Sequence, residues 1–451
     1  MKKFSQYKRL IKFIYAINAI GLVVAVYWFV WVGYYNKIIE DPFWRRGNWL
    51  MVALYAALMA FFYKTYGGFK IAYLKIGNLI WSQILSIIFV NIISYLQIAL
   101  LDKKLHPVYP MFLMTLLDFV IVAVWANFFQ WIYRKMFPPK RLLLVYGERP
   151  AFHLREKINS REDKYYLDSA VNISEGIQKI IKQAVKFDAV IIGDIPAHER
   201  NQLMKLCFQK SIRTYTVPKI SDILLRTSSE LDIFDSPLLL SRNEGLQIEQ
   251  LVTKRALDVI FSIVGLIVSS PFFIIIGLLI KCTDYGPIFY RQKRLTQGGK
   301  EFCICKFRTM IQDAEKGMGA RLAVENDERI LPIGKFLRRT RLDELPQLWN
   351  ILKGEMSVVG PRPERPELAE KIEEEIPEFC YRLKVKAGLT GYAQIYGKYN
   401  TTSYDKLKLD LKYIRNYSLF LDLRLILMTP KIMFMKESTE GIMKEKDTKE
   451  I

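Results

Sequence analysis

Two adjacent acidic residues, Asp343 and Glu344, stand in the middle of a basic stretch of the chain. The stretch Gly334–Pro363 reads GKFLRRTRLDELPQLWNILKGEMSVVGPRP, and its arginines lie on both sides of the pair: Arg338, Arg339, Arg341 and Arg362. A guanidinium group donates two parallel hydrogen bonds to a phosphate. A carboxylate among such groups serves as a nucleophile or as a ligand for Mg2+. The pattern therefore indicates chemistry on a phosphate-containing substrate.

Apolar neighbours of the acidic pair bear on whether it is exposed. Leu342 precedes the pair, and Leu345, Leu348 and Trp349 follow it. The alternative is a solvated helix with ion pairs. The flanking apolar residues favour a buried or half-buried site. The three histidines lie elsewhere in the sequence, so a histidine base is not expected.

The composition combines many apolar residues with many charges. Of 451 residues, 51% are hydrophobic and 25% are charged, which predicts membrane segments joined to two or three domains. The net charge of +21 suits an anionic partner. The basic residues flank apolar segments and no nucleic-acid motif is evident, so we expect membrane lipid and phosphate as partners, and no nucleic acid. The five cysteines show neither a disulfide framework nor a zinc pattern.

Residues 1–136 contain the apolar runs of a predicted four-helix transmembrane bundle. A bilayer core needs about 20 helical residues, and the second run is short. Basic residues cluster before the first run, between the second and third, and after the fourth, so the N-terminus and everything after residue 136 should be cytoplasmic. Asp118 is the only acidic residue within a run, which favours a scaffold over a transport role. The four runs are Leu10–Tyr35, Trp49–Tyr63, Leu79–Leu101 and Met111–Tyr133.

Residues 137–245 predict a small, Rossmann-like parallel α/β domain, because strand and helix patterns alternate. A dinucleotide site needs glycines after the first strand. The turn here, residues 147–150, reads GERP, which disfavours a cofactor site. We expect a degenerate domain with a structural, regulatory or oligomerising role, and a homodimer is a further hypothesis. The predicted strands are Arg141–Tyr146, Asp188–Gly193 and Arg213–Val217, and the predicted helices are Ile173–Lys186 and His198–Gln209.

Another apolar run, Ala256–Ile280, opens the third part of the chain, residues 246–451. A fifth transmembrane helix is one interpretation. Both flanks are basic, however, so both should be cytoplasmic, and Ser270-Pro271 stands in the middle. Proline removes a backbone donor, while a serine hydroxyl can satisfy the freed carbonyl. We therefore predict a re-entrant helix over residues 254–281 that breaks at Ser270-Pro271 and returns to the same face.

Five motifs then occur in order: KRALDVIFSIVGLIVSSPFF, GPIFYRQKR, KFRTM, LDELPQLWNILKGEMSVVGPRP and AGLTGYAQI. From Thr253 to Lys436 the chain resembles the bacterial sugar transferases, or monotopic phosphoglycosyl transferases. The preceding spans and α/β domain resemble the long subgroup, the polyprenyl-phosphate hexose-1-phosphate transferases. The resemblance implies a mainly α catalytic domain at the cytoplasmic face of the bacterial cell membrane. It also implies transfer of a sugar 1-phosphate from a UDP-sugar to undecaprenyl phosphate, which initiates capsule, exopolysaccharide or O-antigen synthesis.

The resemblance implies roles for particular residues. Asp343 would be the nucleophile that forms a phosphosugar intermediate. Glu344 would orient it or bind metal, and Mg2+ would be held by Asp343 and Glu344. The implied substrate-binding residues are Lys306, Arg308, Arg338, Pro361, Arg362, Pro363 and Arg365.

Several alternatives remain open at this point. One keeps the fold but transfers the group directly, with the acidic pair only as metal ligands. Another is a membrane scaffold or regulator with a degenerate transferase domain. The turn Gly388–Gly391 suits either a site or packing, and Tyr413–Met435 suits either the membrane interface or the core. Lys371–Glu375 predicts a solvated helix face.

Overall fold

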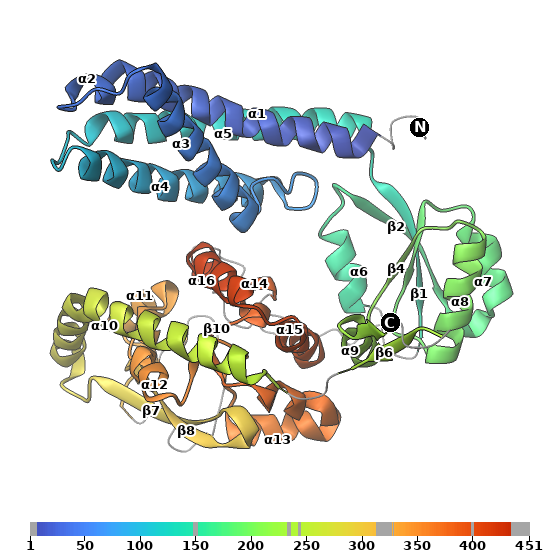
Figure 1. Ribbon diagram of the computed structural model, residues 1–451. Helices are drawn as coiled ribbons and strands as arrows, with labels where there is room; N and C mark the ends of the chain where they lie inside the picture. Colours follow the sequence, from blue (N-terminus) through green and yellow to red (C-terminus); the bar gives the residue numbers. More distant parts are fainter. Residues whose placement is uncertain are drawn as a thin grey trace. The chain divides into compact units, whose positions relative to one another are not determined.

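The computed structural model describes residues 7–147, 152–231, 236–241, 245–312, 327, 329–397 and 401–433 (Figure 1). The chain divides into two compact units, Met1–Lys219 and Ile220–Ile451. Each unit is described by itself. The turn residues 148–150 and the end of the predicted segment Tyr413–Met435 lie outside the described residues.

Four long helices form the first part of the first unit. The first is α1 (Lys8–Val30), which continues through a π-helical turn, η2 (Trp31–Tyr35), and α2 (Asn36–Ile38). It is followed by α3 (Arg45–Tyr66), α4 (Ile76–Leu101) and α5 (Tyr109–Met136). All four are long and apolar enough to cross a bilayer, and they indicate a membrane protein. The second span exceeds the apolar run predicted for it, because the polar residues at both ends of the run are helical too.

Aromatic and polar side chains lie among the aliphatic ones buried inside this helical part. The rings of Tyr27 and Tyr55 stack with centroids 3.9 Å apart. The Tyr55 hydroxyl donates to Asn91 Oδ1 over 2.8 Å, and the Asn91 amide donates to Thr115 Oγ1 over 2.8 Å. Asp118 is fully buried. The two hydrogen bonds between helices compensate for the removal of Tyr55, Asn91 and Thr115 from water.

A four-stranded parallel sheet forms the second part of the first unit, in the order β2-β1-β3-β4. Helix α6 (Phe152–Asn159) covers one face, while α7 (Ile177–Ala184) and α8 (Ala197–Gln209) cover the other (Figure 1). The three strands predicted from the sequence are present. The edge strand β2 was not predicted, because polar residues interrupt its apolar pattern. The strands are β1 (Lys140–Tyr146), β2 (Tyr165–Asn172), β3 (Ala189–Ile192) and β4 (Thr214–Thr216), and η3 (Ile173–Glu175) precedes α7.

Gly147 directly follows β1, at the position where a dinucleotide-binding domain has its phosphate-binding turn. A Cβ here would lie 2.8 Å from the carbonyl oxygen of Asp194, so close packing of two strand ends accounts for this glycine. A cofactor role is therefore not needed to explain it.

The second unit is mainly helical. It begins with α9 (Ile220–Arg226) and the short hairpin β5 (Ser229–Leu231) and β6 (Leu238–Leu240). Helix α9 packs on α15 through Ile220 and Leu411, so both belong to this unit. The predicted three-part division, with boundaries at residues 136 and 245, stays a prediction. The remaining elements are α10 (Ile248–Asp284), β7 (Phe289–Leu295), η4 (Gln297–Gly299), β8 (Glu301–Phe307), α11 (Pro332–Thr340), η5 (Leu342–Glu344), α12 (Gln347–Lys353), β9 (Ser357–Val359), α13 (Pro366–Glu375), η6 (Pro377–Lys384), β10 (Gly388–Thr390), α14 (Tyr392–Tyr396), α15 (Ser403–Arg415) and α16 (Leu419–Met433).

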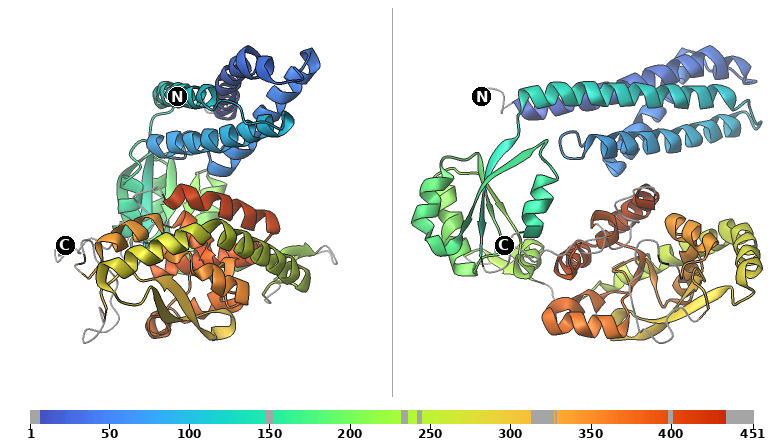
Figure 2. Two further views of the ribbon diagram at one scale, coloured as in Figure 1. Left: turned by 90° about the vertical axis from the view of Figure 1, so that its left-hand side faces the viewer. Right: turned by 180° about the vertical axis from the view of Figure 1, so that it is seen from behind.

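Helix α10 is the fifth helix of the described chain that is long and apolar enough to cross a bilayer. It is continuous through Pro271, where the sequence predicts a break. It bends instead, and its second arm leads into β7 (Figures 1 and 2). Proline at this position leaves the carbonyl oxygen of Ile267 without its helical N–H donor. The Ser270 hydroxyl donates to that oxygen over 2.8 Å, which confirms the predicted role of the serine.

A buried ion pair fixes the first arm of α10 to the rest of the unit. Lys254 Nζ lies 2.7 Å from Asp422 Oδ2 of α16, and both side chains are buried. The Tyr413 hydroxyl of α15 donates to the other Asp422 oxygen over 2.8 Å. In the segment predicted to lie either in the core or in the membrane interface, Leu425 is buried in the core and Phe420 is exposed, and the interface alternative stays a prediction.

Candidate functional site

The acidic pair lies in a single 3-10 turn, η5, between two helices. Helix α11 ends at Thr340 and is followed by Arg341, whose backbone is left-handed with φ 55° and ψ 19°. This conformation is uncommon outside glycine and redirects the chain. Asp343 and Glu344 follow immediately and are each only 8% exposed. The predicted burial of the pair is confirmed.

Glu344 binds two cations that come from different elements. Lys306 Nζ of β8 lies 3.0 Å from Glu344 Oε1, and Arg362 Nη2, from the loop after β9, lies 3.1 Å from the same oxygen. Burial raises the pKa of Glu344, but the charges of Lys306, Arg362 and Arg341 outweigh burial and hold that pKa below its usual value. Glu344 is therefore an ionised anchor for the basic residues.

Asp343 is held differently from its neighbour. Within the described part of the chain, no hydrogen bond reaches its carboxylate. Burial and the negative charge of Glu344 raise the pKa of Asp343 to about 6, although the charges of Lys306, Arg338 and Arg362 oppose the shift. Asp343 is therefore a weakly solvated carboxylate, free to react, that faces several cations.

Three other predicted substrate-binding residues occupy distinct positions. Arg338 lies near the pair, and its Nε donates to Thr309 Oγ1 over 2.9 Å. Arg308 is buried beside Gly286, where a Cβ would overlap its guanidinium group. Arg365 precedes α13, and its carbonyl oxygen accepts from Ala369 N over 2.9 Å. The structure thus brings Lys306, Arg338 and Arg362 to the acidic pair, while Arg308 packs against Gly286 and Arg365 lies at the start of α13.

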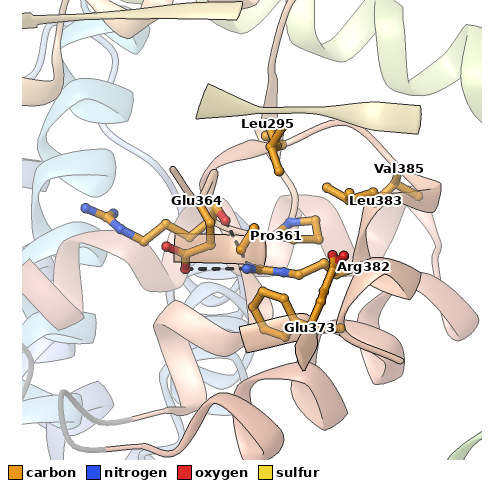
Figure 3. Close-up of a pocket in the computed structure, with 11 residues that line it drawn as sticks. Leu295, Pro361, Glu364, Glu373, Arg382, Leu383 and Val385 are labelled. Atoms are coloured by element: carbon orange, nitrogen blue, oxygen red, sulfur yellow. Dashed lines mark hydrogen bonds and ion pairs between the residues drawn. The ribbon is translucent and has the colours of Figure 1, made fainter. Parts of the chain in front are cut away.

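The loop Pro361–Glu364 presents Arg362 to Glu344, and each of its four carbonyl oxygens accepts a hydrogen bond. Such a loop can be held in one conformation before substrate binds. Figure 3 shows Arg382 directed at this loop, with interactions to Glu364 and to the backbone. The four hydrogen bonds are Gly388 N to Pro361 O (2.8 Å), Arg382 Nη2 to Arg362 O (2.9 Å), Arg294 Nη1 to Pro363 O (3.2 Å) and Leu295 N to Glu364 O (3.0 Å).

Arg382 connects this loop to a buried carboxylate. Its Nη2 also lies 2.9 Å from Asp410 Oδ2 of α15, and its Nη1 lies 3.4 Å from Glu364 Oε1. The cavity beside it in Figure 3 measures about 10 Å³, which has room for a single water. The cavity is therefore too small for a substrate, and Arg382 is a positioning residue. Sequence reasoning missed Arg382 and Asp410, because nothing in their local pattern differs from ordinary surface charges.

Replacing Arg382 with alanine should destabilise the protein by about 3–5 kcal/mol, because Asp410 would remain buried without its partner. The loop would also loosen, so we expect a higher KM for the substrate that Arg362 contacts. Thermal unfolding in detergent and steady-state kinetics measure the two effects. Arg226→Ala, at the exposed end of α9, is the matched control. Unchanged stability and KM in Arg382→Ala would contradict the positioning role.

Glycines bring the two short strands β9 and β10 into contact just before this loop. A Cβ at Gly388 or Gly391 would overlap the backbone of Gly360. The backbone contact needs glycine on both sides. Packing therefore accounts for the glycines of this turn. The side chains of Leu389 and Thr390, between them, can still contribute to a site.

The residues present suit Mg2+ only together with a substrate. No group of three or more potential metal ligands occurs among the residues that the structure describes. Mg2+ is usually held by one or two carboxylates plus substrate phosphates. Asp343 and Glu344 can supply those carboxylates, and the Asp343 oxygens are not engaged in hydrogen bonds within the described chain.

The buried carboxylate pair is thus surrounded by cations and lies next to a long apolar helix. The family model described as bacterial sugar transferase matches residues 249–436, from the start of α10 to just beyond α16. The chain belongs to the bacterial sugar transferase family.

Curated relatives support the same assignment. A putative undecaprenyl-phosphate N-acetylgalactosaminyl 1-phosphate transferase of Bacillus subtilis is 49% identical over 30% of this chain and 74% of its own length. The UDP-N-acetylgalactosamine-undecaprenyl-phosphate N-acetylgalactosaminephosphotransferase of Aeromonas hydrophila is 33% identical over 54% of this chain and 59% of its own. The UDP-glucose:undecaprenyl-phosphate glucose-1-phosphate transferase of Xanthomonas campestris is 36% identical over 52% of this chain and 51% of its own length. The chain thus spans less than two thirds of the length of the latter two.

Proposed function

We propose that this protein transfers a sugar 1-phosphate from a UDP-sugar to undecaprenyl phosphate and releases UMP. The observation that carries the proposal is Asp343, a buried carboxylate without hydrogen bonds in the described chain, opposite Lys306, Arg338 and Arg362. The names of the relatives pair undecaprenyl phosphate with UDP-glucose or UDP-N-acetylgalactosamine. We propose that the product initiates a surface polysaccharide.

The proposed reaction has two steps at one phosphorus atom. An Asp343 oxygen attacks the sugar-bearing phosphorus, the bond from that phosphorus to the bridging oxygen breaks, and UMP leaves with the electron pair. A phosphate oxygen of the lipid then attacks the same phosphorus and displaces the Asp343 carboxylate. Two steps at one site let two large anions react in turn. Lys306 and Arg362 neutralise charge on the phosphoryl oxygens, and Mg2+, when bound, would add to this neutralisation.

Release of UMP tests this function directly. The purified protein in detergent, with undecaprenyl phosphate and Mg2+, is supplied with a panel of UDP-sugars. We expect at least one of them to yield many equivalents of UMP per protein, matched by an equal amount of lipid-linked sugar. If no UDP-sugar yields UMP, the chain is better explained as a scaffold. The same screen identifies the sugar, which depends on contacts worth about 1–3 kcal/mol each.

We also propose that α10 enters the membrane, bends near Pro271 and returns to the cytoplasmic face. The basic residues at both of its ends support this, because loops rich in lysine and arginine favour the cytoplasm. The bend shown in Figure 2 is compatible with re-entry. Asp343 would then lie on the side where nucleotide sugars are found.

The native residue Cys282 tests this topology, because it is exposed and lies near the end of α10. In a variant with Cys207, Cys303, Cys305 and Cys380 replaced by serine, we expect no labelling of Cys282 by an impermeant maleimide in intact cells. Labelling should appear once the membrane is permeabilised. Lys104→Cys, in the loop between α4 and α5, is the control that should react from outside. Labelling of Cys282 in intact cells would show that α10 crosses the membrane.

A further inference from the structure

A second, larger cavity lies beside the acidic pair. It measures about 150 Å³ and is enclosed by residues of η5, α12, β10, α14 and α16. Its walls are mostly apolar, formed by Leu345, Leu348, Leu389, Ile395 and Ile432. An apolar cavity of this size can take up a molecule such as benzene, which is about the size of one isoprene unit. The cavity can therefore hold the beginning of an apolar chain.

The cavity and the catalytic site share a wall. Arg341 and Glu344 line the cavity, and Glu344 is adjacent to the Asp343 nucleophile. An amphiphile with its apolar part in the cavity would therefore place its polar end beside Asp343. Because Arg341 is a cation, that polar end should be an anion.

The apolar wall also connects the cavity to α10. A Cβ at Gly265 of α10 would meet Leu348 Cδ1 at 3.0 Å, so the helix and this cavity residue are in direct contact. Leu266 packs against the same core cluster that contains Leu348. The opposite side of α10 exposes large apolar residues, among them Ile263, Val264 and Ile267. A chain that leaves the cavity would therefore find an apolar surface on the helix proposed to lie in the membrane.

One polar group in the cavity wall is unsatisfied. Gln394 Nε2 is buried and has no hydrogen-bond acceptor within the described chain. The two threonines of the wall, Thr390 and Thr429, bond to each other over 2.9 Å. A buried donor without an acceptor costs free energy. The wall is therefore suited to a mainly apolar ligand that carries an acceptor oxygen.

We propose that this cavity binds the first isoprene units of a polyprenyl phosphate, with its phosphate oxygens at Arg341 and Gln394 Nε2. The proposal rests on the proposed function and assigns its acceptor site. A nucleoside is the competing occupant, but a base and a ribose need several polar partners. Apart from Arg341 and Glu344 at its polar end, this wall offers one buried donor without an acceptor in the described chain and two threonines that are hydrogen-bonded to each other. The nucleotide sugar would instead approach from the side of Arg362.

Photo-crosslinking tests the location without turnover. The probe is a polyprenyl phosphate with a diazirine in its first two isoprene units, bound to the full-length Asp343→Asn protein in nanodiscs. We expect crosslinks in residues 389–395 and 425–433, and we expect undecaprenyl phosphate to suppress them. Crosslinks confined to other segments would overturn the proposal. Suppression by a UDP-sugar but not by undecaprenyl phosphate would assign the cavity to the nucleotide and also overturn it.

Filling the cavity gives a kinetic test. Leu389→Trp should raise the KM for undecaprenyl phosphate at least tenfold and leave the KM for the UDP-sugar unchanged. Leu423→Trp, on the partly exposed face of α16, is the control. An increase confined to the UDP-sugar KM, or no change, would overturn the proposal. If the wild type releases no UMP from any UDP-sugar, the proposed function fails, and crosslinking still decides the cavity.

Discussion

Replacing Asp343 with asparagine is expected to lower turnover by roughly 10⁴–10⁶-fold, the range found when one member of a catalytic unit is removed. Asparagine preserves the size of the side chain but cannot form the acyl phosphate bond. The surrounding cations, Lys306, Arg338 and Arg362, would remain in place. The loss should therefore affect kcat far more than the KM for the UDP-sugar.

Trapping the intermediate distinguishes the two mechanisms. A UDP-sugar with radiolabel in the sugar, incubated without lipid acceptor, should leave label on the wild-type protein and none on Asp343→Asn. Asp168→Asn, which makes the same change at a surface ion pair with Arg141, should be labelled like the wild type. Turnover by a wild type that carries no label would show direct transfer, with the acidic pair as metal ligands.

Thermal unfolding separates lost chemistry from lost folding. The pKa of Asp343 is raised to about 6 in the folded chain from a usual value of 3.8. The folded state therefore binds more protons between these values, and stability falls as pH rises through this window. Asparagine has no charge to bury, so Asp343→Asn should melt no lower than the wild type at pH 7. A clear drop would mean that folding, not catalysis, had been lost.

The second large effect is expected at Glu344. Glu344→Gln removes the shared partner of Lys306 and Arg362, so both cations lose their fixed positions, and we expect kcat to fall roughly 10²-fold. The substitution also changes the pH profile. Asp343 must be ionised to attack, so wild-type activity should fall as pH drops through about 6. Without the negative charge of Glu344, the pKa of Asp343 should decrease, and the acid limb should move to lower pH.

The measurement is kcat against pH between pH 4.5 and 8, under conditions where all variants remain folded. Glu374→Gln, on the exposed face of α13, is the matched control and should leave the profile unchanged. An acid limb that stays in place or moves to higher pH in Glu344→Gln would show that Asp343 is not the group that titrates.

Local patterns in the sequence predicted the elements that depend on nearby residues. The strand β1 reads RLLLVY over most of its length, and a continuous apolar run of that kind predicts a buried strand. The break predicted at Ser270-Pro271 is absent, because α10 continues through Pro271 and the Ser270 hydroxyl satisfies the carbonyl oxygen that the proline leaves without a donor. The apolar neighbours of Asp343 likewise predicted its burial. Strand β2 was missed because Asp168 and Ser169 interrupt its pattern, and pairing with β1 overrides that local signal.

The sequence by itself determined the residue types of the site: a carboxylate pair, arginines for phosphate, and a proline-flanked Arg362. Only the tertiary structure decided which of those residues meet, because side chains distant in the chain are brought together by packing. It placed Lys306 and Arg362 on one oxygen of Glu344 and placed Arg308 beside Gly286. The Arg382 contacts and the cavity at Gln394 likewise arise between elements, where no single stretch of sequence carries the signal.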